Sequence, residues 1–496
     1  MAADTIQSAS NAIRFVLDGQ VVAVSGLPPT MTVLEYLREI AQRTGTKEGC
    51  AEGDCGACTV VLGELAADGT HVNYRAINSC IRLLPTIDGQ ELITVESLQA
   101  ADGSLHPVQQ AMVDQHGSQC GFCTPGFVMS LFVLYLHADT PAREQVLEAL
   151  AGNLCRCTGY RPIIEAGMTM GRYPRPSHWS REAANTAGHR DALRSIQRAQ
   201  AFRLPGWHSP RTTDELAAAL EADPSAVLLA GGTDVGLWVT KQLRELPAII
   251  YLGEVAELRQ LHSDSVGIVI GAAVSLAAGW AAIVGLYPQL AEVAQRFGSP
   301  PVRNSGTLCG NLANASPIGD AIPVLIALGA ILQLRRGKQT RELALEDFYL
   351  GYRRTALTAG EFIVSVSVPA ARSGQRVGSY KLSKRIDQDI SAVCAAVSVQ
   401  VQGAEVRVAR IAFGGMAGIA ARARGAESAL LAAGWNQAGI DAAASALASD
   451  FQPLTDLRSS SAYRLEAAAN LLRRFYLEHS GTRLPLRTTA ALLSTG

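Results

Sequence analysis

The sequence has no excess of charge of either sign. Its 496 residues include 43 Lys and Arg against 44 Asp and Glu, for a net charge of -1. A nearly neutral chain provides no broad positive field, so nucleic acid is not an expected partner. Long hydrophobic runs are also absent: the longest, near 127–136, is too short to span a bilayer, and Met1 to Ser10 contain Asp4 and no apolar leader core. We expect a cytoplasmic protein without a membrane segment.

Several common active-site motifs are missing as well. The nine histidines form no H-E-x-x-H motif or paired helical spacing, which argues against a histidine-ligated zinc or iron. There is no G-x-x-x-x-G-K-[ST] loop and no G-x-G-x-x-G fingerprint. Any bound nucleotide must therefore be held by another device.

Eight of the ten cysteines form two groups near the N-terminus. The first group has the spacing C-x4-C-x2-C followed by a more distant cysteine, which is the spacing of plant-type 2Fe-2S ferredoxins. Glycines within its loop allow the backbone to wrap a cluster and direct N–H groups at sulfide. A four-cysteine zinc site and a disulfide framework are the alternatives. The members of this group are Cys50, Cys55, Cys58 and Cys80.

The second group is C-x2-C, a long gap, then C-x-C, a spacing that suits zinc as well as iron–sulfur. Thr124-Pro125 predicts a helix N-cap followed by proline at the first helical position, and Pro162 predicts the start of another helix. Two helix N-termini facing one anionic cluster would stabilise its charge. The members of this group are Cys120, Cys123, Cys155 and Cys157.

Together these cysteines and their neighbours resemble the iron–sulfur half of the xanthine dehydrogenase (molybdenum hydroxylase) family. The resemblance rests on the segments 50–80, 120–126 (CGFCTPG) and 155–160 (CRCTGY), and all eight ligand positions match. It implies a 2Fe-2S cluster in each group, the first in a β-grasp ferredoxin domain and the second in a small helical bundle.

At a typical domain size, 496 residues predict roughly three or four domains. Alternating apolar residues around Asp18-Gly19 predict a hairpin, and Thr32 to Glu35 form a capping box opening a helix to about Arg43. Further helices are predicted at 107–116, 126–137 and 142–151. Near the C-terminus we predict strands at 391–401 and 406–413, and helices at 426–431, 437–447 and 459–478.

The predicted fold is α+β and multidomain. Residues 10–88 form the ferredoxin-type domain and 89–171 the helical 2Fe-2S domain. Residues 172–200, rich in proline and arginine, form a linker. By resemblance, 201–378 form a vanillyl-alcohol-oxidase-like FAD-binding domain, and 379–491 form an α+β domain like the C-terminal domain of CO dehydrogenase flavoproteins.

A buried strand at 227–229 leads into a glycine-containing turn that would allow close approach to a pyrophosphate, although an ordinary tight loop is the alternative. A second segment, 305–320, is dense in small and hydroxyl residues. Both resemble the flavin half of the same family. The resemblance implies that FAD is bound by Leu228, Leu229, Ala230, Gly231, Gly232, Thr233, Asp234, Val235, Thr307, Leu308, Cys309, Gly310, Asn311, Asn314, Ser316 and Asp320.

Three more positions match flavin contacts of the family: Phe297, near the isoalloxazine ring, Ile363 and Lys381. Without that match, Phe297 fits a core residue and Lys381 a surface lysine. The charged residues of 385–389 match a loop near the ring, or simply form a solvated loop. Gly232 and Asp234 replace the asparagine and glutamate of some family members. Cys309 and Cys394 belong to no ligand set and are expected to be buried thiols.

The resemblance implies the function of the small, iron–sulfur/FAD subunit. Electrons from purine oxidation at a molybdopterin-binding large subunit would pass through the two clusters to FAD and then to NAD, because a flavin exchanges electrons singly or in pairs. No residue of this chain is then catalytic for purine hydroxylation. Two small and two large subunits are the expected assembly.

Two alternatives remain. The same domains occur in molybdenum hydroxylases acting on aldehydes, CO, quinolines or aromatic acyl-CoA. A stand-alone electron carrier without an NAD site would belong to another class.

Overall fold

The computed structural model describes residues 11–481. The chain divides into two compact units, which are described separately. Of the described residues, the first unit contains 11–219, 225–255 and 298–306, and the second contains 220–224, 256–297 and 307–481. The absence of an apolar leader core was predicted for Met1 to Ser10, which lie outside the described residues. The same holds for residue 10 and residues 482–491, at the ends of the predicted domains. Among the helices of 11–481, none combines the length and apolar composition needed to span a membrane.

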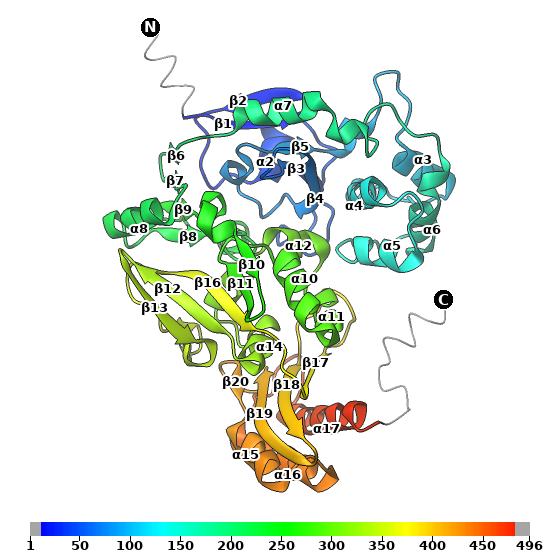
Figure 1. The fold of residues 1–496 in the computed structure, drawn as a ribbon. Helices are drawn as coiled ribbons and strands as arrows, with labels where there is room; N and C mark the ends of the chain where they lie inside the picture. Colours follow the sequence, from blue (N-terminus) through cyan, green and yellow to red (C-terminus); the bar gives the residue numbers. More distant parts are fainter. Residues whose placement is uncertain (1–10, 482–496) are drawn as a thin grey trace. The chain divides into compact units, whose positions relative to one another are not determined.

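A mixed five-stranded sheet opens the first unit. Its strands are β1 (Ile13–Leu17), β2 (Gln20–Val24), β3 (Thr59–Leu65), β4 (Val72–Asn78) and β5 (Glu91–Ile93). The strand order is β2-β1-β5-β3-β4, with β1 parallel to β5 and all other pairs antiparallel (Figure 1). The predicted hairpin at Asp18-Gly19 and the expected β-grasp arrangement are confirmed.

Both faces of this sheet are covered. Side chains alternate along β3, so Val60 joins the core containing Phe15, whereas Val61 joins the core containing Phe127. Since β3 is buried on both sides, its sequence is almost continuously apolar.

The predicted capping box at Thr32 is formed. Glu35 accepts the Thr32 N–H at 2.7 Å, and Thr32 Oγ1 accepts the Glu35 N–H at 3.1 Å. The helix is shorter than predicted: α2 (Val33–Glu35) continues as the π-helical turn η1 (Tyr36–Ile40) and does not reach Arg43. The helix ends before Gln42, because the φ of Gln42 is 56°, in the left-handed region that helical residues avoid.

Four helices form the bundle that follows: α3 (Pro107–Asp114), α4 (Thr124–His137), α5 (Arg143–Leu150) and α6 (Arg161–Thr169). The helices predicted here are confirmed, including the one that Pro162 opens. The N-cap prediction for Thr124 is wrong. Cys123 occupies the N-cap position, and the Thr124 hydroxyl donates to Ser118 Oγ at 2.8 Å instead of capping the helix. Most of α4 is buried, so it lies at the centre of this bundle.

The segment predicted as a linker, 172–200, is folded onto the first sheet. It begins at the last residue of the short turn η4 (Met170–Arg172) and contains the turn η5 (Ala183–Asn185) and the helix α7 (Ala187–Ile196). Leu193 and Ile196 are buried in the core, and Arg198 forms an ion pair with Asp88 at 2.5 Å. Its proline and arginine content suggested an open connection, but two apolar residues at helical spacing give α7 a buried face.

A small four-stranded sheet completes the first unit, in the order β6-β7-β9-β8. Its strands are β6 (Phe202–Leu204), β7 (Trp207–Ser209), β8 (Val227–Leu229) and β9 (Ile249–Tyr251). The associated helices are α8 (Thr213–Ala222), α9 (Val235–Thr240) and α12 (Pro300–Ser305). β8 is the strand predicted before the glycine-containing turn.

The second unit contains a five-stranded antiparallel sheet in the order β10-β11-β16-β12-β13 (Figure 1). Its strands are β10 (Leu261–Ser263), β11 (Gly267–Gly271), β12 (Ile331–Arg336), β13 (Gln339–Ala344) and β16 (Glu361–Pro369). A two-stranded ribbon pairs β14 (Tyr349–Gly351) with β15 (Arg354–Thr355). The helices are α10 (Leu276–Leu286), α11 (Ala291–Gln295), α13 (Leu308–Ala313) and α14 (Ala321–Leu328).

The same unit ends in an α+β domain. Its sheet has the order β17-β18-β19-β20, formed by β17 (Gln375–Leu382), β18 (Val393–Gln402), β19 (Glu405–Gly414) and β20 (Ala421–Arg422). The helices are α15 (Arg424–Ala433), α16 (Gln437–Asp450) and α17 (Ser461–His479). The predicted strands and helices of this region are confirmed. Val397 on β18 joins the core formed with these helices, whereas Cys394 faces the buried helix α14.

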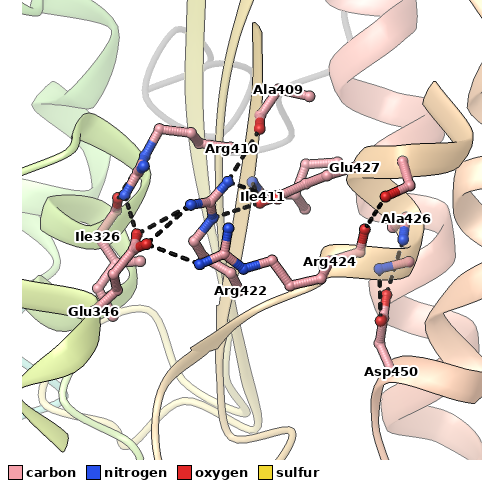
Figure 2. A network of polar contacts seen from close by, with 12 residues as sticks. Ile326, Glu346, Ala409, Arg410, Ile411, Arg422, Arg424, Ala426, Glu427 and Asp450 are labelled. Atoms are coloured by element: carbon pink, nitrogen blue, oxygen red, sulfur yellow. Dashed lines mark hydrogen bonds and ion pairs between the residues drawn. The ribbon is translucent and has the colours of Figure 1, made fainter. Parts of the chain in front are cut away.

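Glu346 joins this domain to the preceding part of the second unit (Figure 2). It lies in the turn η9 (Leu345–Asp347) and contacts Arg410, Arg422 at 3.0 Å and Arg424 at 2.8 Å. Arg422 also bonds Glu427 at 2.7 Å. Although burial acts to raise the pKa of Glu346, the guanidinium groups hold it below its usual value.

We predict that Glu346→Gln lowers the stability of the second unit by about 3 kcal/mol, because three guanidinium groups lose their shared carboxylate. Because this pKa is depressed, the stabilisation is present above the unfolded-state pKa and is lost as the pH falls through the folded-state pKa. The thermal unfolding midpoint measures the effect. Glu405→Gln, which breaks an exposed pair with Arg407, is the control and should change little. Equal midpoints for the two variants would contradict the assignment.

Candidate functional site

The first group of thiols lies where β3 and β4 meet. Cys58 directly precedes β3, and Cys80 follows β4 by two residues. Thr59 pairs with Asn78 across these strands, so the two thiols are close, with 3.3 Å between Cys58 Sγ and Cys80 Sγ. Cys50 and Cys55 approach from the preceding loop, and all four thiols are free.

Two backbone N–H groups in the loop point at the sulfur of Cys50, whereas the glycine content predicted N–H groups directed at the sulfide of a cluster. Cys50 Sγ accepts the N–H of Asp54 at 3.4 Å and of Cys55 at 3.3 Å. Ala51 and Gly53 have φ of 53° and 79°, which turn the chain around the sulfur. Hydrogen bonds from Cys55 and Cys80 lower the pKa of the Cys50 thiol, so negative charge is favoured at this sulfur.

The second group lies at the N-termini of α4 and α6. Cys123 is the N-cap residue of α4, and Cys155 and Cys157 precede α6. Burial, followed by a hydrogen bond with Cys155, raises the pKa of the Cys123 thiol to about 12. A hydrogen bond with Cys120 raises the pKa of the Cys157 thiol. These contacts arrange the group as two pairs of thiols.

Each group therefore supplies four free thiols that contact one another. A 2Fe-2S cluster takes four cysteine thiolates, so the donor set fits such a cluster. Across residues 11–481, no three His, Cys, Asp or Glu side chains are arranged to hold a single metal ion. The cysteines that sequence spacing placed in two sets are thus brought together as those two sets.

Two hydroxyl groups beside Cys155 had no role in the sequence analysis. Thr158 Oγ1 lies 3.2 Å from Cys155 Sγ, and the Cys155 N–H donates to the Tyr160 hydroxyl at 3.0 Å. Although burial acts to raise the pKa of the Cys155 thiol, hydrogen bonds from Thr158, Cys157 and Cys123 together lower it. A hydroxyl residue three positions after a predicted ligand was the available signal.

The two thiol groups are joined through the backbone. The Leu154 N–H donates to the Cys55 carbonyl at 2.9 Å. Leu154 directly precedes Cys155 of the second group, and Cys55 belongs to the first group, so this bond connects the two. Beside this bond, buried Asn153 donates to the Gly56 carbonyl at 3.1 Å. The junction is tight, because a Cβ on Gly56 would lie 2.1 Å from the Gly152 oxygen.

The first predicted flavin segment, 228–235, runs from β8 through the glycine turn into α9. Gly232 has φ 77° and no contact closer than 3.7 Å to its Cβ position. Gly231 is different, because a Cβ there would lie 2.1 Å from the Ser305 oxygen. The close approach allowed by Gly231 is therefore to the protein's own backbone, whereas that predicted from sequence was to a pyrophosphate.

This glycine turn lies beside the first thiol group. A Cβ on Gly236 would lie 2.4 Å from the oxygen of Ile81, the residue after Cys80. At the end of α9, the Thr240 hydroxyl donates to the Ala51 carbonyl at 2.7 Å, next to Cys50. Within the first unit, both ends of the turn–helix segment thus contact neighbours of predicted cluster ligands.

Residues 307–320 of the second predicted flavin segment belong to the second unit. Thr307 caps α13 by accepting the Gly310 N–H at 3.0 Å. Leu308 and Cys309 point into the core, as predicted for the Cys309 thiol, so only their backbone is available to a ligand. The Asn311 Oδ1 atom is buried and has no hydrogen-bond partner among the described residues. An unpartnered acceptor fits a segment that binds a ligand with N–H or O–H donors.

Asn314 and Ser316 continue this segment. Asn314 follows the last turn of α13, and Ser316 Oγ accepts the Ile318 N–H at 3.4 Å. Between them, Ala315 has φ 51°, so the chain turns sharply here. Asn314 and Ser316 therefore lie on either side of this turn, and each has a polar side chain that a ligand of this segment could contact.

Asp320 and Lys381 form a buried ion pair at 2.8 Å. Asp320 Oδ1 also accepts the hydroxyl of Ser391 at 2.6 Å, and Lys381 donates to the Arg296 carbonyl at 3.1 Å. The surface-lysine alternative for Lys381 is therefore wrong, since its side chain is only 4% exposed. The two predicted flavin contacts neutralise each other, which reduces the cost of burying them.

Phe297 and Ile363 are both buried in the second unit. Phe297 packs against Trp280 with 5.8 Å between ring centroids, and the Trp280 indole N–H is buried without a described partner. The loop at 385–389 is largely exposed and contains an Arg385–Asp389 contact at 3.8 Å. Phe297 thus packs in the core against Trp280, whose indole N–H donates no hydrogen bond to a described residue.

Four family models match consecutive parts of the chain. Residues 15–83 match a 2Fe-2S iron-sulfur cluster binding domain, and 94–168 match a 2Fe-2S binding domain. Residues 199–371 match the FAD binding domain in molybdopterin dehydrogenase, and 378–479 match the CO dehydrogenase flavoprotein C-terminal domain.

Solved structures resemble a little over half of the chain. Carbon monoxide dehydrogenase from Hydrogenophaga pseudoflava is 31% identical, with a TM-score of 0.51 over 54% of this chain and 94% of that chain. Quinoline 2-oxidoreductase from Pseudomonas putida 86 is 26% identical, with a TM-score of 0.51 over 56% of this chain and 98% of that chain.

Sequence relatives match a larger part of the chain. Xanthine dehydrogenase of Emericella nidulans is 33% identical over 94% of it, and xanthine dehydrogenase/oxidase of Gallus gallus is 30% identical over 81%. The chain belongs to the molybdenum hydroxylase family. The chain spans only 38% and 35% of the lengths of these two proteins. It therefore corresponds to the iron–sulfur and flavin part of such proteins, and the predicted multidomain fold is confirmed.

We predict that Gly56→Ala disrupts the junction between the thiol groups. The left-handed φ of 70° alone costs about 1–2 kcal/mol for alanine, and the clash with the Gly152 oxygen adds to it. Iron content and the thermal unfolding midpoint should both fall. Gly103→Ala is the matched control, because Gly103 has φ 86° but nothing within 4 Å of its Cβ position. If both variants behave alike, the close approach at Gly56 is unimportant.

Proposed function

We propose that this chain is the electron-transfer subunit of a xanthine dehydrogenase. A molybdopterin-binding partner subunit oxidises hypoxanthine or xanthine to urate, and the electrons pass through two 2Fe-2S clusters to FAD and finally to NAD. Iron–sulfur clusters carry single electrons, and a flavin collects them and delivers hydride. Identities of 33% and 32% to xanthine dehydrogenases over 94% and 83% of this chain, with cluster and flavin domains together on it, support this substrate class.

The observation that carries the proposal is the set of contacts within the first unit. The Leu154–Cys55 hydrogen bond joins the two thiol groups, and the Thr240–Ala51 hydrogen bond joins the glycine turn to the first of them. Electron transfer needs its centres close together in a protein frame that holds them rigidly. The two hydrogen bonds named above, one between backbone groups and one from the Thr240 hydroxyl to a backbone carbonyl, contribute to that frame.

Each group of residues has a proposed role. Cys50, Cys55, Cys58 and Cys80 hold the first cluster, and Cys120, Cys123, Cys155 and Cys157 hold the second. The proposed FAD contacts are residues 228–235 in the first unit and, in the second unit, Phe297, Thr307, Leu308, Cys309, Gly310, Asn311, Asn314, Ser316, Asp320, Ile363 and Lys381. Within the chain, these residues bind and orient the groups, and none performs the purine hydroxylation. The proposed assembly has two small and two large subunits and works in the cytoplasm.

A second candidate is the same role in a molybdenum hydroxylase with another substrate. The solved structures that match a little over half of the chain are named for carbon monoxide and quinoline. Anaerobic reduction of the assembled enzyme by xanthine, an aldehyde, CO or a quinoline discriminates the two, because only the true substrate bleaches the flavin and cluster absorbance.

The test of the electron-transfer function is the composition of the purified chain. We expect about four irons and four sulfides, one FAD, and two distinct EPR signals after reduction, as two 2Fe-2S centres require. The chain should also catalyse NADH-dependent dye reduction, which a carrier without an NAD site cannot do. Zinc in place of iron, or the absence of flavin, would refute the proposal.

Cys55→Ser tests the order of electron flow in the enzyme assembled with its partner. We expect xanthine to reduce molybdenum as before, while NADH formation slows at least tenfold because one link of the pathway is weakened. Stopped-flow spectra and steady-state NADH absorbance measure the two steps. Cys394→Ala, at a buried thiol outside both groups, is the matched control and should leave both rates unchanged. Normal NADH formation in Cys55→Ser would count against Cys55 as a ligand.

A further inference from the structure

We propose that Thr158 raises the reduction potential of the cluster held by the second thiol group, by donating a hydrogen bond from its hydroxyl to Cys155 Sγ. The inference rests on the proposed binding of a 2Fe-2S cluster at this group. In this role, Thr158 does not bind iron itself; its hydroxyl acts through Cys155 on the reduction potential of the cluster.

The contact is a hydrogen bond of defined direction. Thr158 Oγ1 lies 3.2 Å from Cys155 Sγ, within the range for a bond to sulfur. A cysteine that ligates iron is a thiolate and has no proton to donate, so the hydroxyl must be the donor. The same oxygen accepts the Tyr160 N–H at 3.2 Å, which leaves its own hydrogen directed at the sulfur.

The surrounding loop holds the hydroxyl in this position. The Cys155 N–H donates to the Tyr160 hydroxyl at 3.0 Å, and the Tyr160 ring packs against Phe127 with 6.3 Å between centroids. Gly159 and Tyr160 have successive left-handed φ values of 68° and 69°. A non-glycine residue in this region costs about 1–2 kcal/mol, so the turn is maintained by its contacts.

The electrostatic consequence has a definite sign. One-electron reduction makes the cluster and its thiolates more negative, and a hydroxyl dipole directed at a ligand sulfur stabilises that added charge. Hydrogen bonds to sulfur are among the factors that set the potentials of iron–sulfur centres. The bond from Thr158 therefore favours the reduced state of the second cluster.

The first thiol group uses a different device. Cys50 Sγ receives backbone N–H groups of Asp54 and Cys55, which no side-chain substitution removes. The Thr158 hydroxyl is thus a side-chain donor whose removal should change one centre and leave the other as an internal reference.

The experiment is an EPR-monitored redox titration of the purified full chain. Thr158→Val removes the hydroxyl with little change of volume, and it should shift the midpoint potential of one EPR signal to a more negative value while the other signal is unchanged. Thr158→Ser retains the hydroxyl and should restore the wild-type midpoint. Thr169→Val is the matched control, since the Thr169 hydroxyl donates to the Glu165 carbonyl within the same domain and contacts no thiol.

The outcomes separate this inference from the proposed function. Absence of iron or of two signals in the wild-type chain would refute the cluster assignment itself. With both signals present, unchanged midpoints in Thr158→Val would overturn the role of Thr158 alone. If the valine variant loses the second cluster, Thr158→Ala takes its place in the titration. Loss of the cluster in both variants would also overturn the inference, because the hydroxyl would then hold the site together instead of tuning it.

Discussion

The close backbone approach around the first cysteine loop is the constraint on which the rest of the first unit depends. The Cys55 and Gly56 carbonyls accept hydrogen bonds from Leu154 and Asn153, and a Cβ on Gly126 would lie 2.1 Å from the Gly56 oxygen. Only glycine permits such distances between backbones. The loop is therefore held by segments about 70 to 100 residues away in sequence, and its position fixes that of the neighbouring helical bundle.

Buried charge plays the corresponding part in the second unit. Asp320 and Lys381 are paired and bonded to further polar groups, and Glu346 is shared by three arginines. Each pair links the part of the chain matched by the FAD-binding model to the C-terminal domain. A buried ion pair contributes little net stability, but removing one partner is costly, so these contacts favour a single arrangement of the two parts.

The two thiol groups differ in how they stabilise negative charge. The first relies on backbone N–H groups of a tightly wound loop, and its thiols near β3 and β4 are buried. The second lies at two helix N-termini, with Cys120 and Cys157 exposed and a side-chain hydroxyl beside Cys155. Exposure and hydrogen bonding to sulfur both influence the potential of an iron–sulfur centre, so two sites with the same four-cysteine donor set need not be equivalent.

Local sequence patterns were sufficient for the two sets of cysteines, the β8 strand and most helices, because spacing and apolar periodicity are properties of neighbouring residues. The family resemblance added the flavin segments. Tertiary structure alone decided that 172–200 folds onto the first sheet, that Thr124 does not cap α4, and that Lys381 is buried against Asp320. It also decided that Gly231 approaches the backbone of Ser305. For 172–200, Lys381 and Gly231 the deciding partners are far away in sequence, and no local pattern carries the position of a distant hydrogen-bond acceptor or charge. For Thr124 the partner is Ser118, six residues earlier, and the spacing of these residues does not show which acceptor the hydroxyl reaches in the folded loop.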